Sequence, residues 1–374
     1  MRCHLLTSAM VAALSWTAVP VRAQPAAATT DSLPPPQQAE LRIQTQVKGY
    51  AANFEYHNAM VEGRTLFGGQ GQALLSWIAP AAGSRRITAA AGVYMRRDFG
   101  DHSFASDLLP LLLVQWDRGP LALRLGLLQS EACHGLPPPL CAETRDFVQG
   151  AEEGVQVLLD LERFDLDAWV AWLGLNTPRQ REHFVAGVST RLALGIISVP
   201  LALTVEHYGG EQYAPPGDPV RQNVAGAGGV RLAYPLRGRL REVGGEVVGY
   251  GSYVDGEVGA PSVTRGGSGV SGTVWVRPFD VYVGLSGFYG QRFTVWMGDP
   301  VYQTGEPYAA LSVSRRVDLG RLAQLEVGLR LELIDRPLAD YFKDVEHRAW
   351  LSLRCNLDEC LWRRADKPAA TATE

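Results

Sequence analysis

Apolar and polar residues alternate along most of the chain, and the clearest case lies between Ala323 and Leu333. Every odd position there is apolar, whereas the even positions carry Gln, Glu, Gly, Arg and Glu. Successive side chains of a β-strand point to opposite faces, so this pattern predicts a strand with one apolar and one wet face. A helix of the same sequence would scatter its charges around the circumference.

About sixteen segments of this kind follow one another between residues 40 and 357. A strand that crosses a membrane needs about 9–11 residues, and each segment is long enough for that. We expect the strands at residues 40–54, 65–79, 85–98, 106–116, 120–129, 152–163, 166–175, 181–196, 199–208, 222–235, 240–254, 267–277, 281–294, 306–317, 321–334 and 344–356.

The connections between these segments alternate in length. Phe164–Asp165 and Asp318–Gly320 are tight turns, whereas Ser130–Ala151, Gly209–Arg221 and Asp255–Arg265 are long. Short turns on one side and long loops on the other are typical of a transmembrane β-barrel, and lipid forces such a sheet to close. The sequence therefore predicts an all-β fold, a transmembrane antiparallel up-and-down barrel of about sixteen strands. A soluble periplasmic sandwich or propeller is the alternative, but no repeat with a fixed period of 40–50 residues is present.

The N-terminus has the pattern of a secretory signal peptide. Arg2 precedes a mostly apolar stretch, Leu5–Val19, and Val21–Ala23 resembles a cleavage site. We therefore expect a signal peptide at 1–23, a disordered periplasmic leader at 24–39, the barrel at 40–357 and a periplasmic tail at 358–374. The net charge is −4, and nucleic acid is an unsuitable partner for an exported acidic chain.

Four cysteines remain after signal cleavage: Cys133, Cys141, Cys355 and Cys360. An exported protein enters an oxidising compartment, and both pairs are close in sequence, so we expect the disulfides Cys133–Cys141 and Cys355–Cys360. A zinc site is the alternative, but four thiolates would have to meet across the fold. We expect no metal and no cofactor.

In architecture the mature chain resembles the outer-membrane porins of Gram-negative bacteria. About sixteen strands, eight outer loops and a long third loop carry the resemblance. It implies an outer-membrane location, contact with outer-membrane lipids and lipopolysaccharide, and insertion by the barrel-assembly machinery. It also implies a channel for small hydrophilic solutes and, since porins are often trimers, a homotrimer.

Alternation places a set of charged residues on the polar, inward face. Closure makes the first and last strands neighbours, so their cations form a basic stripe. Such a stripe would act as an electrostatic filter favouring anionic or hydroxyl-rich solutes. The alternative is a set of cross-strand salt bridges that only solvate the wall. The expected pore-lining residues are Arg42, Lys48, Arg96, Arg124, Glu326, Arg330, Glu332, Arg348 and Arg354.

The third long loop, Ser130–Ala151, is the best candidate for a constriction. A sixteen-stranded barrel leaves an aqueous channel unless something narrows it. The loop carries Glu131, Glu143 and Asp146. By the porin resemblance, it would fold inward with these acids facing Arg96, Arg124 or the basic stripe. A rigid exterior loop is the alternative.

Two other functions stay open beside the channel. The first is an outer-membrane conduit for polysaccharide export, since aromatic side chains in a lumen suit sugars; the expected inward aromatics are Tyr50, Tyr94, Trp275, Phe288 and Trp350. The second is a barrel enzyme acting on lipid or lipopolysaccharide, with Glu206, His207 and Ser189 near the outer rim. Alternation puts His207 on the face opposite Glu206, so we expect no catalytic residues and no enzyme.

Overall fold

The computed structural model describes residues 38–81, 85–210, 220–257, 260–334 and 345–364. The predicted signal peptide, nearly all of the predicted leader and the last ten residues lie outside these ranges. No helix in the described part of the chain is long and apolar enough to cross a membrane.

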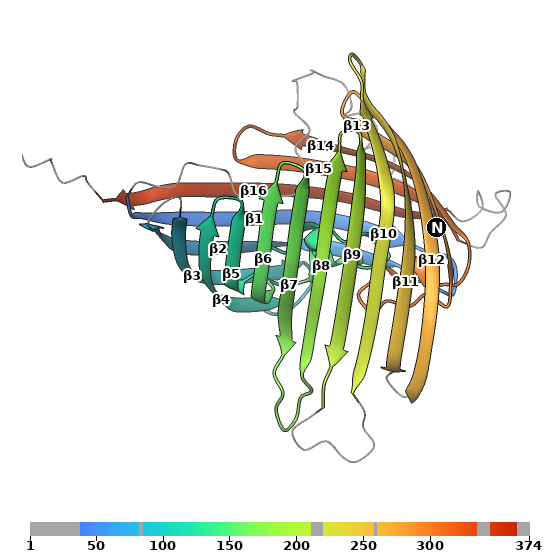
Figure 1. Cartoon of the computed structure of the whole chain (residues 1–374), viewed down its shortest axis with the longest axis horizontal. Coiled ribbons are helices and arrows are strands. Elements are labelled where there is room, and N and C mark those ends of the chain that lie inside the picture. The colour runs from blue at the N-terminus through green and yellow to red at the C-terminus, as the bar shows by residue number, and fades with distance from the viewer. Residues whose placement is uncertain (1–37, 82–84, 211–219, 258–259, 335–344, 365–374) are drawn as a thin grey trace, which may run out of the picture.

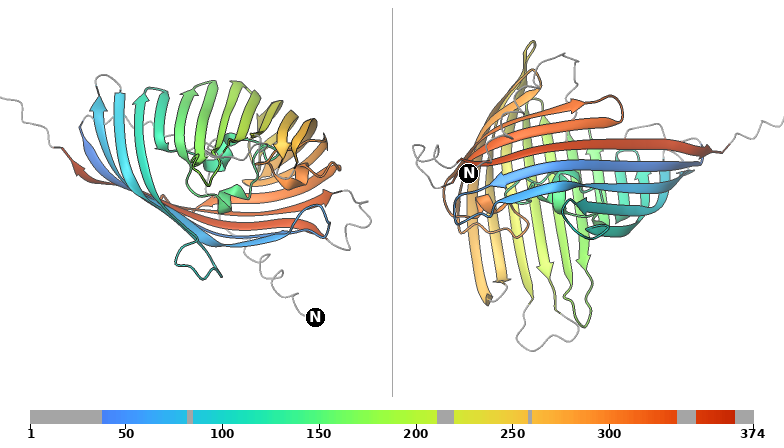
Figure 2. Two further views of the ribbon diagram at one scale, coloured as in Figure 1. Left: turned by 90° about the horizontal axis from the view of Figure 1, so that it is seen from below. Right: turned by 180° about the vertical axis from the view of Figure 1, so that it is seen from behind.

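The described residues form one closed barrel of antiparallel strands, in which each strand pairs with its neighbours in sequence and β1 also pairs with β16 (Figures 1 and 2). This confirms the predicted fold class. The strands are β1 Glu40–Glu55, β2 Arg64–Ala81, β3 Arg85–Asp98, β4 Asp107–Arg118, β5 Leu121–Leu127, β6 Glu153–Leu161, β7 Phe164–Gly174, β8 His183–Leu194, β9 Ile197–Tyr208, β10 Arg221–Pro235, β11 Leu240–Glu257, β12 Ala260–Pro278, β13 Val281–Gln291, β14 Tyr308–Asp318, β15 Ala323–Ile334 and β16 Glu346–Arg363.

The apolar side of the alternating pattern faces outward. On β4, the outward side chains of Leu112 and Val114 are 66% and 52% exposed, whereas the inward side chain of Gln115 on the same strand is buried. On β15, Leu329 is exposed while Glu332 is completely buried. A closed sheet with an apolar exterior satisfies its backbone internally and leaves its outer surface to lipid. The described part of the chain therefore has the surface of a transmembrane β-barrel.

Two predicted boundaries were wrong. The predicted loop Asp255–Arg265 is mostly strand, because Val254 pairs with Arg265 and Asp255 with Thr264, which extends the β11–β12 hairpin. The barrel also does not end at residue 357. β16 continues to Arg363, which pairs with Glu40, because β1 supplies backbone partners along this whole length.

Two loops lie inside the ring of strands (Figure 2, left). The cystine loop, residues 128–152, joins β5 to β6 and contains the 3₁₀ turn η1 Glu131–Gly135 and the short helix α1 Arg145–Val148. The second inward loop, residues 292–307, joins β13 to β14 and contains η2 Pro300–Tyr302. The amide of Ala142 donates to the Met297 carbonyl (2.8 Å), so the loops bind each other directly.

These loops build an apolar core within the barrel. Leu140 of the cystine loop and Val301 of the second inward loop are both 0% exposed, and they belong to one cluster with Phe288 and Tyr302. Burying these side chains removes apolar surface from water, which is the main driving force for packing the loops inward. This part of the lumen is therefore filled by protein.

The cysteine prediction was half right. The Cys133–Cys141 disulfide is present and closes the cystine loop. The predicted Cys355–Cys360 disulfide is wrong, since both are free thiols on β16. Five positions along an extended strand separate the two Cα atoms by roughly 17 Å, well beyond the reach of a disulfide.

The thiol count gives a direct test. A maleimide reagent applied to the unfolded, unreduced chain from residue 24 onward should add two labels, on Cys355 and Cys360, and reduction should raise the number to four. Intact mass measures the number of labels, and peptide mapping assigns them. A mature chain that takes up no label before reduction would contradict the free thiols on β16.

Candidate functional site

The predicted wall residues lie on the inward side of their strands, and closure brings the two ends of the stripe together. Lys48 on β1 stands opposite Arg354 on β16. Some of the stripe residues bind other wall residues. Arg42 pairs with Asp358 (2.7 Å), and Glu326 pairs with Arg316 (2.9 Å).

The acids of the cystine loop meet the basic stripe. The loop folds inward, and each of its three predicted acids contacts a different cation. A bidentate arrangement joins Glu143 to Arg330, which is the geometry of a strong ion pair. The pairs are Glu131 with Arg354 (3.0 Å), Glu143 with Arg330 (2.7 and 2.9 Å) and Asp146 with Lys48.

The other two cations proposed as partners of the loop are engaged elsewhere. Arg96 pairs with Asp98 (2.9 Å) and Asp107 (2.7 Å). Arg124 donates to the carbonyl of Leu127 (3.2 Å), the last residue of β5, and to the side-chain oxygen of Gln129 in the cystine loop (3.5 Å), which is not one of the loop acids. The stripe beside the β1–β16 seam, and not the β3–β5 wall, therefore receives the acids of the loop.

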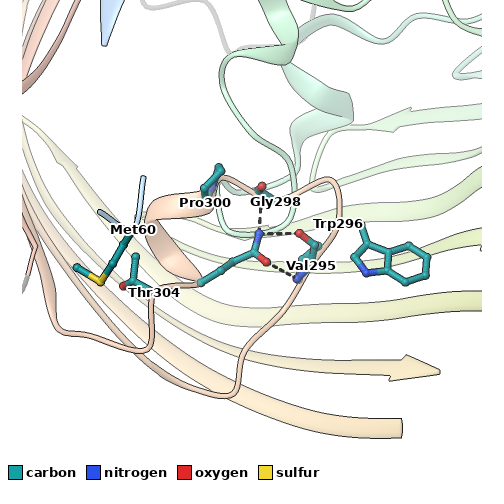
Figure 3. Close-up of a pocket in the computed structure, with 7 residues that line it drawn as sticks. Met60, Val295, Trp296, Gly298, Pro300 and Thr304 are labelled. Carbon is teal, nitrogen blue, oxygen red and sulfur yellow. Dashed lines mark hydrogen bonds between the residues drawn. The ribbon is translucent and has the colours of Figure 1, made fainter. Parts of the chain in front are cut away.

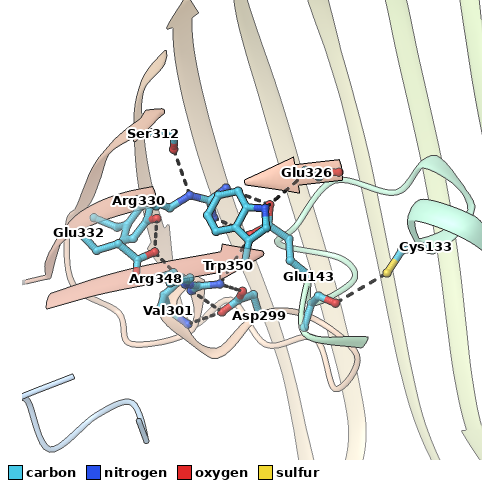
Figure 4. Close-up of polar contacts among 12 residues, drawn as sticks. Cys133, Glu143, Asp299, Val301, Ser312, Glu326, Arg330, Glu332, Arg348 and Trp350 are labelled. Carbon is cyan, nitrogen blue, oxygen red and sulfur yellow. Dashed lines mark hydrogen bonds and ion pairs between the residues drawn. The ribbon is translucent and has the colours of Figure 1, made fainter. Parts of the chain in front are cut away.

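Arg348 joins both inward loops to the barrel wall (Figure 4). Its guanidinium binds both carboxylate oxygens of Asp299, one at 3.0 Å, and its Nε lies 3.0 Å from Glu332 on β15. Glu143 of the cystine loop lies 3.7 Å from the same guanidinium. The Arg348 and Asp299 side chains are each only 3% exposed. Two loops that are distant in sequence thus depend on one cation.

The Arg348→Met substitution should destabilise the barrel by about 3–5 kcal/mol, because it leaves Asp299 and Glu332 buried without their cation. Urea unfolding of the protein in lipid vesicles, followed by tryptophan fluorescence, measures the loss. Arg316→Met is the matched control, since its pair with Glu326 is exposed and should be worth less than about 1 kcal/mol. Equal losses in the two variants would contradict a special role for Arg348.

A second buried cluster surrounds His134 of the cystine loop. Its Nδ1 lies 2.9 Å from Asp167 on β7, and its Nε2 lies 2.8 Å from Glu152 at the end of the loop. The ring stacks on Trp169 with centroids 3.9 Å apart. Burial lowers the pKa of the His134 ring, but the hydrogen bonds to Asp167 and Glu152 outweigh burial and raise the pKa above its ordinary value. The two carboxylates therefore favour the protonated ring, and His134 ties the loop to the wall through both of them.

This raised pKa predicts a pH dependence of stability. The contribution of His134 is fully present below its unfolded pKa of about 6.5 and is lost as pH rises through the higher folded pKa. The melting temperature of the wild type should therefore fall relative to that of His134→Gln as pH rises above about 6.5. Parallel melting curves for the two proteins across this range would contradict the assignment.

A third group lies where β8 and β9 approach the long loops. Nε2 of His183 is 3.0 Å from Oε1 of Glu206, and the two residues form what we call the outer dyad. Among the described residues, the buried Oε2 of Glu206 has no hydrogen-bond partner. His183 stacks on Tyr208 with ring centroids 3.9 Å apart. A carboxylate that holds one imidazole nitrogen leaves the other one able to accept a proton.

A cavity of about 400 Å³ lies beside Trp296 of the second inward loop (Figure 3). Trp296 connects the cavity to this third group, because it lines the cavity and its ring lies 5.6 Å from that of Tyr208. The Gln303 amide donates to the carbonyls of Val295 (2.7 Å) and Gly298 (3.2 Å), so its polar atoms are occupied within the loop. The cavity is lined by Met60, Val295, Trp296, Gly298, Pro300, Gln303 and Thr304.

The two residues weighed beside Glu206 in the sequence, Ser189 and His207, have other partners in the structure. Ser189 donates to the backbone carbonyl of His134 (2.6 Å), and His207 stacks on Phe184 with centroids 4.8 Å apart. The true partner, His183, lies on the neighbouring strand, where the register places Val185 opposite Glu206. Knowledge of that register was the missing signal.

Comparison with known proteins gives a family and a fold. The family model described as "Lipid A 3'-O-deacylase-type" matches residues 33–343, which is most of the 374-residue chain. The chain belongs to this family. Because the family is one of enzymes, the sequence-based expectation that the protein is not an enzyme was wrong.

Solved structures similar to this deacylase-type chain are outer-membrane porins. One is OpdL of Pseudomonas aeruginosa, with 11% identity and a TM-score of 0.51, where the match covers 87% of this chain and 99% of that chain. Another is an anion-selective porin from Comamonas acidovorans, with 11% identity and a TM-score of 0.51, where the match covers 86% of this chain and 100% of that chain. OmpT of Vibrio cholerae, in a trimer form, is also similar (9%, 86% and 100%, 0.53). At these identities the likeness concerns the fold, and it agrees with the predicted outer-membrane location. No curated protein matches the chain.

Proposed function

We propose that this protein hydrolyses an acyl ester of a lipid A-type glycolipid at the outer mouth of its barrel. The family match supports the substrate class, since a lipid A 3'-O-deacylase removes an ester-linked acyl chain. The observation that carries the proposal for this chain is the outer dyad, in which Glu206 orients His183 at 3.0 Å.

In the proposed reaction His183 acts as a general base. Its Nδ1 takes a proton from a water molecule as the water oxygen attacks the ester carbonyl carbon. The tetrahedral intermediate then collapses, the bond from the carbonyl carbon to the alkoxy oxygen breaks, and the proton on His183 passes to that oxygen. The products are a fatty acid and a free sugar hydroxyl. Glu206 holds the ring in position and stabilises the imidazolium that forms between the two steps.

The test uses the mature protein in vesicles that contain lipopolysaccharide. Mass spectrometry of lipid A should show loss of one acyl chain with the wild type. His183→Ala and Glu206→Gln should each reduce the rate at least about a hundredfold, which is the scale of general-base catalysis.

His207→Gln is the matched control, because His207 is the neighbour of Glu206 in sequence but packs on Phe184 outside the outer dyad. It should retain wild-type activity. Heat-dependent migration on gels confirms that each variant is folded. Wild-type protein that leaves lipid A intact would refute the function, and full activity in both dyad variants would refute the assignment of the residues.

Passage of small hydrophilic solutes is a second candidate function. It is favoured by the contact of the loop acids with the basic stripe, since charge of this kind along a lumen biases ions. The Glu131–Arg354 pair is the most accessible part, with side chains 42% and 27% exposed. Arg354→Ala should reduce the anion preference of single-channel currents in a planar bilayer. If the wild-type protein gives no conductance steps in the bilayer, the channel function is eliminated.

The remaining sequence-based hypotheses stay predictions. For polysaccharide export, Tyr50, Tyr94, Trp275 and Phe288 are each at most 5% exposed, so they present no open ring face to a sugar. A homotrimer and insertion by the barrel-assembly machinery follow from the porin resemblance alone.

A further inference from the structure

We infer that the cavity beside Trp296 binds an acyl chain of the substrate and that Met60 sets the length of chain it accepts. The inference rests on the proposed hydrolase function and deepens it by assigning the apolar part of the substrate to a site. It begins with the composition of the cavity wall. Met60, Val295, Trp296 and Pro300 supply apolar surface, and Gly298 adds no side chain.

The two polar side chains of the wall, Gln303 and Thr304, already make hydrogen bonds within the loop. Besides donating to two carbonyls, the Gln303 side chain accepts from the Val295 amide at 3.1 Å. The Thr304 hydroxyl accepts from the Glu306 amide at 3.2 Å. A polar ligand would have to compete with these bonds, whereas an alkyl chain displaces only water. The volume of about 400 Å³ is within the usual range for small-ligand sites.

The position of the cavity links it to the outer dyad. Trp296 lines the cavity, its ring lies 5.6 Å from that of Tyr208, and Tyr208 stacks on His183. In Figure 3 the indole of Trp296 points away from the other lining residues, so this residue leads from the cavity toward its ring partner Tyr208. An ester carbonyl at His183 would therefore have its alkyl chain lying along Trp296, with the distal end in the cavity.

Met60 is suited to control chain length. Its side chain lines the cavity while the residue is 42% exposed, so it stands at the rim. Its hydrogen bond to Asn58 at 2.8 Å uses the backbone amide alone. A substitution of the side chain can therefore change the cavity and leave this contact in place.

The first experiment measures kcat/KM on nitrophenyl esters of four to sixteen carbons. Each methylene that leaves water strengthens binding about fourfold. A bulkier rim that keeps about two methylenes out of the cavity should therefore lower kcat/KM for long-chain esters about fifteenfold. Met60→Trp should show this loss and leave the four-carbon ester unchanged. Met60→Ala, which also serves if the larger residue prevents folding, should shift the preference to longer chains.

Phe104→Trp is the control, because Phe104 is 83% exposed and does not line the cavity. Its chain-length profile should match that of the wild type. Unchanged profiles in both Met60 variants would overturn the inference while leaving the hydrolase function intact.

The second experiment does not depend on catalysis. A diazirine-bearing fatty acid is photolysed with the protein in vesicles, and peptide mapping locates the adducts. Adducts at Met60 and within residues 295–304 are expected, and Met60→Trp should reduce them. Labelling confined to lipid-facing residues such as Leu201 and Leu203 would overturn the inference. If the fatty acid labels the cavity but the protein hydrolyses no ester, the acyl-chain site is supported and the proposed hydrolase function is refuted.

Discussion

The interior of this barrel depends on the buried contact between Arg348 and its carboxylates. An arginine removed from water is tolerated only when its charge and hydrogen bonds are compensated, and Asp299 and Glu332 provide this compensation at 3.0 Å each. Asp299 lies on the second inward loop, and that loop binds the cystine loop through Met297 and Ala142. The charge on β16 thus determines where both loops lie.

In a membrane barrel the apolar side chains face outward and the polar side chains face inward, and the two inward loops have to pack against this polar inner wall. Because the strands give their apolar faces to lipid, the inner wall is left with charged and amide side chains. A loop can pack there only if it brings its own apolar surface and pairs the charges of the wall. The cystine loop does both, through Leu140 and Glu143. Mid-barrel charges are consequently engaged in structure, and the outer mouth retains His183 and the cavity beside Trp296.

Much of the fold could be predicted from the sequence, because lipid imposes a period of two that can be counted. Alternation identified the strands, closure placed Lys48 beside Arg354, and the inward cystine loop with its acids followed from the porin resemblance. Contacts that depend on three-dimensional packing could not be predicted. The partners of His134 come from two different elements, and nothing in the sequence marks Asp299 as the partner of Arg348.

Two errors have the same physical origin. Both come from strand geometry that the sequence does not give. The pairing of Cys355 with Cys360 assumed that nearness in sequence means nearness in space, whereas residues five positions apart on an extended strand are separated. For Glu206, the sequence analysis weighed His207 and Ser189, but the partner is His183 on the neighbouring strand. The expectation that the chain has no enzymatic role rested on rejecting that set of residues, and the family match overturned it.

The two inward loops are held against the β1–β16 seam as one ordered unit. Hydrogen–deuterium exchange of the protein in lipid vesicles tests this most directly. Slow exchange is expected for the amides of Ala142 and Tyr302, which donate to backbone carbonyls within the packed loops. Exchange of these amides as rapid as that of an unstructured peptide would contradict it.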